Sequence, residues 1–537
     1  MKKVIALLLA LTMLFALAAC GGDKDAAAGN SADPGTSSKP GTSSTPGTSA
    51  KPDNSGSAEA KDNDLVVLIA SDIDSFDNCI SAKSVQTQVL PLIHGKLVHT
   101  DENGNIYNVM VESIENPDKL TWIFKIHDGL KFSDGSDLTS EDVAYSVQRA
   151  KDSPLAARLF APVEKIEVVD ELSIKITTSG PHPLMELALC HVTSMIVSKD
   201  YCENQAEADG WANPPCAGPY KIESRTIGDS IKLVPNEYYN LEEMKPENTS
   251  LTFKVVPEAS SRTIMLEAGD ADVIFGFQSS DYDRVNSNPD LSIYTAPSAT
   301  MYYMAMDTKT NEYFSNKLVR QAVNYAIDRE ACCVVGYNGY ATPLYSYTAP
   351  TCSTYLENPQ GYTYNPEKAK ELLAQAGYPN GFSTTMVVSG ETGTVVAETV
   401  QAYLAAVGIK AEIKLVEDTS LYVNMAPNGE LPLSIATWGT LSDPGYFINR
   451  ILGTDGLGGY NFAQYVNAEV DALFAEAANT LDQERRDECY KEALIIMAEE
   501  APWAPILNPS SFSVLNANLQ GVIAGSYGLK SLAYLHY

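Results

Sequence analysis

The sequence from residue 63 onward predicts a mixed α/β fold divided into lobes. A short apolar run, Leu65 to Ala70, ends at a Ser-Asp pair, as a buried first strand of an α/β sheet does. Thr121 to Ile126 alternates in polarity and leads into Asp128-Gly129, which indicates a strand entering a turn. Because the chain exceeds the size at which one core keeps growing, we expect more than one lobe.

Three helices are predicted from the residues at their starts. Thr139, with Asp142 three positions later, is a capping signature and opens the first helix. Ser315 is expected to cap the second, whose apolar residues recur at helical spacing. Asn365-Pro366 begins the third, which should stop at Gly377 because glycine commonly ends helices.

The N-terminus has the pattern of a bacterial lipoprotein signal. Lys2 and Lys3 precede an apolar run at 4–16, and small residues then precede Cys20. A charged start, a short apolar region and small residues at the cut mark a cleaved secretory signal, and a cysteine directly after them can carry a diacylglycerol thioether. A transmembrane helix is the alternative, but the run falls short of the roughly 20 residues that a bilayer span needs. We expect residues 1–19 to be the signal peptide and Cys20 the lipidated residue.

A tether is predicted between the anchor and the folded part. Residues 34–52 read as three hexads, PGTSSK, PGTSST and PGTSAK, followed by proline. Such a sequence has no apolar surface to bury, so it should stay extended and mobile. We assign residues 20–62 to a lipid-anchored flexible linker. The protein should therefore act outside the cytoplasm, held to the cell membrane by lipid alone.

Composition and charge exclude several classes of function. The formal net charge of −31 argues against nucleic-acid binding and against a basic membrane-binding face. No two of the six histidines stand three or four residues apart, so we expect no metal site, and no cofactor. A secreted hydrolase would need a nucleophile elbow or a metal pair, but neither G-x-S-x-G nor H-E-x-x-H occurs. We do not expect an enzyme.

Eight cysteines follow Cys20, and their pairing is left open. An even number in an exported protein permits disulfides without identifying them. Cys332 and Cys333 are adjacent on a predicted helix and point about 100° apart, so we favour free, partly buried thiols for this pair.

The run Leu120 to Gly135, which continues to Ser146, resembles the signature of the family 5 extracellular solute-binding proteins of ABC importers, the oligopeptide, dipeptide and nickel receptors. Further blocks are similar to this family in order along the chain. They are Ala217 to Lys221, Asn236 to Tyr239, Leu266 to Asp272, Val319 to Ala322, Tyr325 to Arg329, Tyr364 to Lys370, Ala376 to Tyr378 and Ala501 to Pro505.

The resemblance implies a two-lobed, periplasmic-binding-protein-like type II fold with the ligand enclosed between the lobes. Lobe one would comprise residues 63–297 plus 500–537, with an extra subdomain at about 96–210. Lobe two would comprise residues 298–499. A ligand that touches both lobes would favour the closed form through its differential affinity, and an ABC permease would read that form.

The family places its ligand against lobe two near a tryptophan, which implies Trp438 with Thr437, Gly439 and Thr440 as ligand-binding residues. In the peptide receptors an Asp three positions after this Trp pairs with the peptide's ammonium group, but here Leu441 stands at that offset. Asp443 follows two residues later; it is assigned to the ligand, with capping of the next turn as the alternative. Trp438 could equally be a core aromatic.

Lobe one should contribute ligand contacts from loops after its early strands, and we assign Ser75, Ser84 and Gln86 to them. Seven tyrosines also fall between residues 337 and 364, of which we expect one or two at most to touch a ligand.

A peptide is the leading ligand class, delivered to an ABC permease by a monomeric receptor. The alternatives are a receptor for a sugar, a metal chelate or another polar solute, and a signalling or adhesive surface lipoprotein. Because Leu441 replaces the acid and no Arg occurs between Arg329 and Arg450, we expect recognition of the ligand main chain rather than a clamp on both terminal charges.

Overall fold

The computed structural model describes residues 63–389, 392–440 and 442–537. The predicted signal peptide, Cys20, the linker and Leu441 lie outside these ranges. No helix in the described ranges is long and apolar enough to cross a membrane.

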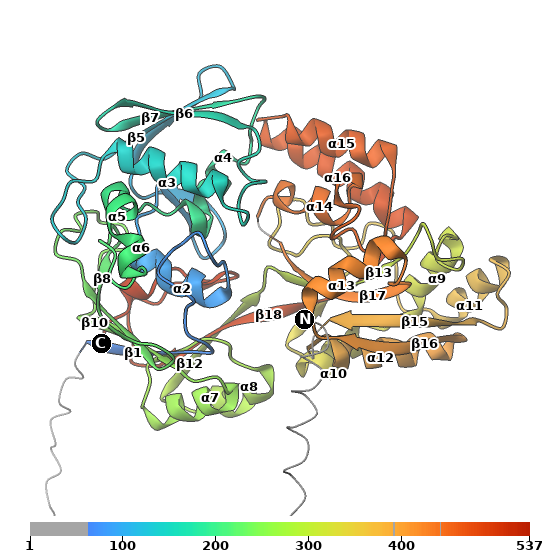
Figure 1. The fold of residues 1–537 in the computed structure, drawn as a ribbon. Coiled ribbons are helices and arrows are strands. Elements are labelled where there is room, and N and C mark those ends of the chain that lie inside the picture. The colour runs from blue at the N-terminus through green and yellow to red at the C-terminus, as the bar shows by residue number, and fades with distance from the viewer. Residues whose placement is uncertain (1–62, 390–391, 441) are drawn as a thin grey trace, which may run out of the picture. The chain divides into compact units, whose positions relative to one another are not determined.

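One sheet of twelve strands connects the two lobes (Figure 1). Its strand order is β16-β15-β17-β13-β18-β11-β1-β10-β9-β8, and β12 and β14 pair with β18 off this path. β1 is parallel to both of its neighbours, β10 and β11, and is buried along most of its length, as the apolar run at its position predicts.

β18 (Trp503–Asn516) is the strand shared between the lobes. Its first part, Trp503 to Leu507, pairs with β13 of lobe two, and Ser510 to Asn516 pairs with β12 of lobe one. Asn508, between these parts, is 1% exposed and donates to the carbonyls of Ser298 (2.8 Å) and Thr300 (2.5 Å). The chain therefore crosses between the lobes along strands that are hydrogen-bonded to one another.

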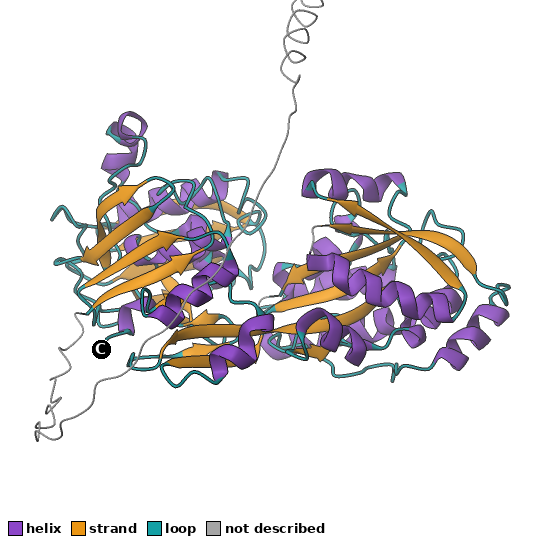
Figure 2. Ribbon diagram, turned by 90° about the horizontal axis from the view of Figure 1, so that it is seen from below, coloured by secondary structure: helices purple, strands orange, loops and turns teal. Residues whose placement is uncertain are grey.

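Lobe one outside the 96–210 region consists mainly of strands with helices packed beside them (Figures 1 and 2). Its elements are β1 (Asp64–Ile69), α2 (Ser84–Ile93), β8 (Tyr220–Thr226), β9 (Ser230–Pro235), β10 (Ser250–Val255), α7 (Ala259–Ala268), β11 (Val273–Ile274), η2 (Ser279–Asp281), α8 (Tyr282–Asn286), β12 (Leu291–Pro297), β19 (Ala524–Gly525), β20 (Gly528–Leu529) and η6 (Leu532–Tyr534).

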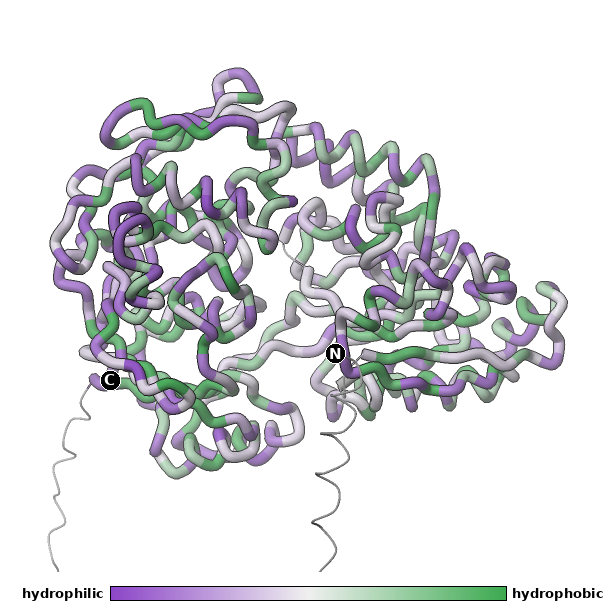
Figure 3. The backbone as a smooth tube through the Cα atoms, viewed as in Figure 1, coloured by the Kyte–Doolittle hydropathy of each residue, from purple (hydrophilic) through white to green (hydrophobic). Residues whose placement is uncertain are grey.

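The region predicted as an extra subdomain has a four-stranded antiparallel sheet, β4-β5-β7-β6, and a hydrophobic core of its own. In Figure 3 the segments that form α5 and α6 carry mostly the colour of hydrophilic residues. The elements are β2 (Val98–Thr100), β3 (Ile106–Asn108), β4 (Val111–Glu115), β5 (Thr121–Ile126), α3 (Ser140–Asp152), β6 (Val163–Asp170), β7 (Ser173–Thr178), α4 (Met185–Cys190), η1 (Val192–Ser194), α5 (Lys199–Asn204) and α6 (Ala206–Asp209).

Lobe two packs helices on both sides of β13, β15, β16 and β17, with a separate core on each side. Its elements are β13 (Thr300–Met306), α9 (Lys317–Ala326), α10 (Arg329–Tyr337), β14 (Ala341–Pro343), α11 (Pro366–Gln375), β15 (Phe382–Ser389), α12 (Thr392–Ala406), β16 (Ile409–Val416), α13 (Thr419–Met425), η3 (Ala426–Asn428), β17 (Leu433–Gly439), η4 (Pro444–Tyr446), α14 (Ile448–Ile451), η5 (Thr454–Gly456), α15 (Ala468–Ala478) and α16 (Gln483–Glu500). The residue bounds of the lobes and subdomain stay predictions.

Most of the predicted elements are confirmed. The strand 121–126 is β5, and α3 begins at a reciprocal capping box between Thr139 and Asp142. α11 begins after Asn365, whose side chain accepts from the Lys368 N–H at 2.9 Å, and it ends before Gly377 at φ +95°.

Two predictions need correction. The cap of α9 is Asn316 and not Ser315, because the Asn316 side chain accepts from the Leu318 N–H at 2.9 Å, whereas the Ser315 hydroxyl donates backward to Glu312. Ser84 and Gln86 lie in the first turn of α2 rather than in a loop. Sequence periodicity locates a helix better than its first residue, since neighbouring polar side chains compete for the cap.

All eight described cysteines are free thiols. Cys332 and Cys333 lie on α10, as predicted, and both are buried.

Candidate functional site

The end of β17 presents the residues that the sequence assigned to the ligand in lobe two. On one edge, Thr300 to Met306 of β13 pairs with β17 as far as Gly439. On the other edge, β15 pairs only with Leu433 to Ile435. Within the described residues, the β15-side edge of Ala436 to Gly439 therefore has no partner strand. Thr437 and Gly439 are exposed at this edge, and Trp438 is half-buried.

A cavity of about 260 Å³ opens beside this unpaired edge. Trp438 forms one wall, with its ring edge-to-face against Tyr460 at 5.3 Å between centroids. The Arg450 guanidinium lies 4.1 Å from the centroid of the Tyr460 ring and 5.6 Å from that of Trp438. The lining residues are Tyr302, Ser389, Gly393, Thr419, Tyr422, Val423, Ile435, Ala436, Thr437, Trp438, Tyr460 and Phe462.

Thr440 connects this edge to the crossover between the lobes. Its side chain is fully buried, and both its backbone N–H (2.6 Å) and its hydroxyl (2.9 Å) donate to the carbonyl of Ala299. These two bonds hold the end of β17 against the start of β13. Thr440 therefore positions the strand end, and its assignment to the ligand stays a prediction.

Asp443 is engaged within the protein. Its two carboxylate oxygens accept from the Arg486 guanidinium at 2.6 and 2.9 Å, and Oδ1 also accepts from the Gly445 N–H at 2.8 Å. Arg486 is almost fully buried, with 2% of its side chain exposed. The hydrogen bond from Gly445 therefore supports the alternative that Asp443 caps the next turn. Ligand binding by Asp443 stays a prediction.

The lobe-one residues assigned to the ligand occupy different environments. Ser84 is exposed on the first turn of α2, whereas Gln86 is fully buried. Ser75 is half-buried, and its hydroxyl accepts from the Asp77 N–H at 3.0 Å. An ion pair at 3.0 Å between Lys83 and Asp74 joins the two segments. Ser84 is the one of the three that lines a described cavity.

That cavity has a volume of about 550 Å³ and lies in lobe one. Ser84 and Leu92 of α2, Phe275 after β11 and Phe512 of β18 contribute to its walls. The C-terminal segment closes another side through Tyr527, whose hydroxyl donates to the Thr440 carbonyl of lobe two at 3.5 Å. One wall residue of the lobe-one cavity therefore also contacts the strand end of lobe two that follows Trp438.

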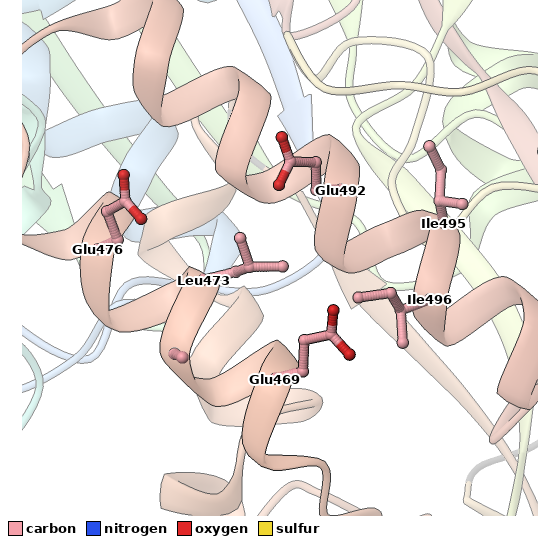
Figure 4. Close-up of a pocket in the computed structure, with 7 residues that line it drawn as sticks. Glu469, Leu473, Glu476, Glu492, Ile495 and Ile496 are labelled. Carbon is pink, nitrogen blue, oxygen red and sulfur yellow. The ribbon is translucent and has the colours of Figure 1, made fainter.

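A third cavity, of about 420 Å³, lies between α15 and α16 (Figure 4). Its apolar floor includes Leu473 and Ile496, and Glu469, Glu476 and Glu492 stand around it. None of the residues assigned from the sequence lines it, so we place the ligand site elsewhere. Within the described ranges, no group of three or more His, Cys, Asp or Glu side chains could hold a metal ion.

Sequence reasoning missed Arg450, Tyr460 and Tyr422 as neighbours of Trp438. Arg450 lies on α14 and Tyr460 follows η5, so both come after the η4 turn that follows β17, and no spacing in the sequence relates them to the strand. None of the seven tyrosines between residues 337 and 364 lines the cavity beside Trp438. Two of them, Tyr347 and Tyr362, are buried packing residues whose hydroxyls donate to backbone carbonyls.

Comparison with known proteins relates the chain to extracellular receptors. The family described as bacterial extracellular solute-binding proteins, family 5 Middle, matches residues 105–459, which is more than half of the chain. The glutathione-binding protein GsiB of Salmonella paratyphi A is 29% identical over 471 residues, covering 85% of this chain and 91% of that protein.

Solved structures extend the likeness to the fold. HbpA2 from Haemophilus parasuis is 25% identical, with a TM-score of 0.78, and the match covers 88% of this chain and 99% of that one. The oligopeptide-binding protein AppA from Bacillus subtilis, in complex with a nonapeptide, is 25% identical, with a TM-score of 0.71 and coverage of 88% and 98%.

Proposed function

The chain belongs to family 5 of the bacterial extracellular solute-binding proteins, and from this premise we propose that it captures a peptide between its lobes and delivers it to the permease of an ABC importer. The family membership makes the chain a substrate-binding protein of ABC importers and not an enzyme. Its fold is the type II fold of periplasmic binding proteins. The peptide, the delivery step and the lipid anchor are our proposals.

The unpaired edge of β17 beside the Trp438 cavity is the observation that carries the peptide proposal. An extended peptide can add to an open strand edge through main-chain hydrogen bonds, while a neighbouring pocket accepts its side chains. In the part of the chain that the structure describes, Ala436 to Gly439 offers such an edge, and aromatic rings line the adjoining cavity. The relatives named glutathione-binding proteins support this class of ligand, because glutathione is a tripeptide.

We expect recognition to depend on the ligand main chain more than on its ammonium terminus. Asp443 already uses both oxygens on Arg486, and sharing this half-buried carboxylate with a ligand would weaken that pair. Arg450, on the face of Tyr460, supplies a cation close to Trp438. N-acetylated peptides should therefore bind about as tightly as their unblocked forms.

Native mass spectrometry of the protein from its own host tests the proposal. A peptide should co-purify, and Trp438→Ala should lose it because the cavity wall is removed. Tyr294→Ala is a matched control, since Tyr294 is an exposed aromatic residue on β12 that lines neither cavity. A sugar or metal chelate in place of the peptide, or retention of the peptide by Trp438→Ala, would contradict the proposal.

Lipid anchoring is tested at the cysteine itself. Cys20→Ala should release the processed protein from membranes, since no helix in the described residues is suited to cross one. Fractionation followed by a salt wash measures the release. A variant that stays with the membrane after washing would contradict the anchor.

A further inference from the structure

Lys96, just before β2, is a buried cation that has no counter-ion and one weak hydrogen bond among the described residues. Its side chain lines the 550 Å³ cavity of lobe one, and the residue is only 6% exposed. An ammonium group has three N–H donors, yet its one hydrogen-bond partner in the described chain is His99 Nδ1, at a long 3.4 Å. That nitrogen also accepts from the Thr100 N–H at 2.8 Å, so it carries no proton of its own.

A second lysine lines the same cavity. The Lys530 ammonium lies 4.9 Å from the centroid of the Tyr107 ring and forms no ion pair in the described part of the chain. Burial, together with the positive charges of Lys96 and Lys530, holds the pKa of His99 well below its usual range. The three side chains therefore present two positive charges and a neutral imidazole to a cavity that Asp101 and Glu102 also line. Asp101 interacts electrostatically with Lys530, so Lys96 is the less compensated of the two lysines.

The acidic and thiol groups around the cavity do not neutralise Lys96. Asp101 directs its carboxylate to Asn103 and Asn105 of its own turn, and Glu102 accepts from Asn103. Burial raises the pKa of the Cys190 thiol to about 12, so this cavity-lining thiol is neutral. Burial also lowers the pKa of Lys96 to about 8, which reflects the cost of keeping its charge without a counter-ion.

We propose that this cavity binds a carboxylate of the ligand, with Lys96 and Lys530 as its cationic partners. The proposal rests on the proposed function, because it assigns the lobe-one cavity to the same site as Trp438. One contact supports that assignment, since Tyr527 of the cavity wall donates to the Thr440 carbonyl. Ser84, which the sequence predicts as a ligand residue, also lines the cavity, and that role stays a prediction. A bound carboxylate would supply the missing acceptor and counter-charge for Lys96.

Lys96→Met tests the proposal, because methionine keeps an unbranched side chain and removes the charge. The probe is a pool of N-acetylated tripeptides, prepared once as free acids and once as C-terminal amides. The wild type should retain acids over amides by about tenfold or more. Lys96→Met should lose most of this preference while still retaining peptides, and Lys530→Met should reduce it. Lys254→Met, which removes an exposed lysine of β10, should behave like the wild type.

Two further readouts keep the test decisive. Without ligand, Lys96→Met should unfold at the same temperature as the wild type or higher, because it removes an uncompensated buried charge; a clear drop would assign Lys96 to structure and overturn the proposal. Equal retention of acids and amides by the wild type would also overturn it.

If the wild type retains neither form, the peptide proposal fails on its own. The cavity is then judged with sodium glutarate at constant ionic strength. Stabilisation of the wild type but not of Lys96→Met would uphold the carboxylate site, and no stabilisation would overturn it.

Discussion

At the scale of single residues, the structure gives Asp443 a partner within the protein. The sequence places this acid beside the family's ligand position, but folding brings Arg486 of α16 against it. The pair is bidentate and its arginine is almost fully buried, which is the geometry of a strong structural contact. Arg486 is 43 residues away along the chain, so no local sequence pattern could predict the pair.

Asp443→Ala should destabilise the protein by about 3 kcal/mol, because it leaves the Arg486 charge buried without a partner. Chemical denaturation measures the loss. Asp487→Ala on α16 is the control, since Asp487 accepts hydrogen bonds at the surface and should cost little. Asp443→Ala combined with Arg486→Leu should recover much of the stability, and a double variant as unstable as the single one would contradict this account.

His94 should make the stability of the protein depend on pH in the acidic range. Its Nε2–H donates to the Phe76 carbonyl at 2.8 Å, and burial lowers its pKa from 6.5 to about 4. Between these values the unfolded chain binds a proton that the native protein does not. Stability should therefore fall as the pH falls from 6.5 to 4, by up to about 1.4 kcal/mol per pH unit from this residue.

The slope of unfolding free energy against pH measures the effect. His94→Gln should flatten the slope in this window, whatever its effect on stability at neutral pH. An unaltered slope in His94→Gln would contradict the assignment.

At the scale of elements, strand ends and crossovers position the site. β17 continues past its pairing with β15, so among the described residues no strand pairs with its edge next to Trp438. Thr440 fixes the end of that edge to Ala299, at the start of the strand that leads into lobe two. The open edge and its anchor come from strand register, which depends on pairing between distant segments.

The linker at residues 20–62 is expected to extend the folded part away from the membrane and not to stabilise it. Deletion of residues 34–52 should leave the thermal unfolding of the protein unchanged within error, because these hexads have no apolar side chains to bury. Calorimetry of the two forms checks this. A loss of several degrees would mean that the hexads dock on the lobes.

At the scale of the whole molecule, β18 is the part of the chain that both lobes share. It pairs with β13 at one end and β12 at the other, and Asn508 between them bonds to Ser298 and Thr300. Motion of the lobes must therefore be absorbed by a few residues near these crossings, as in hinge closure around a ligand.

Ligand should compact the protein and stabilise it. A ligand that binds only the native cleft raises the free energy of unfolding by about 2.7 kcal/mol at 100 times its Kd. The unfolding temperature should rise with ligand concentration, and small-angle scattering should show a smaller radius of gyration. Trp438→Ala at the same ligand concentration is the control. Binding without compaction would contradict the hinge.

The sequence by itself determined the fold class and the family. The strand at 121–126, the cap at Thr139 and the helix after Asn365 all form as expected, because strand alternation, capping and glycine stops act between residues close in the chain. These local patterns also carry the family blocks, which together indicated a solute-binding protein.

Only the tertiary structure decided what surrounds the site. It paired Asp443 with Arg486, set Arg450 on the ring of Tyr460 beside Trp438, and left Lys96 and Lys530 facing one cavity. These partners lie from ten to more than four hundred residues apart, and packing that no short pattern encodes either compensates their charges or leaves them without a counter-ion. Secondary structure depends largely on neighbouring residues, whereas the electrostatics of a cleft depend on burial and on contacts between distant residues.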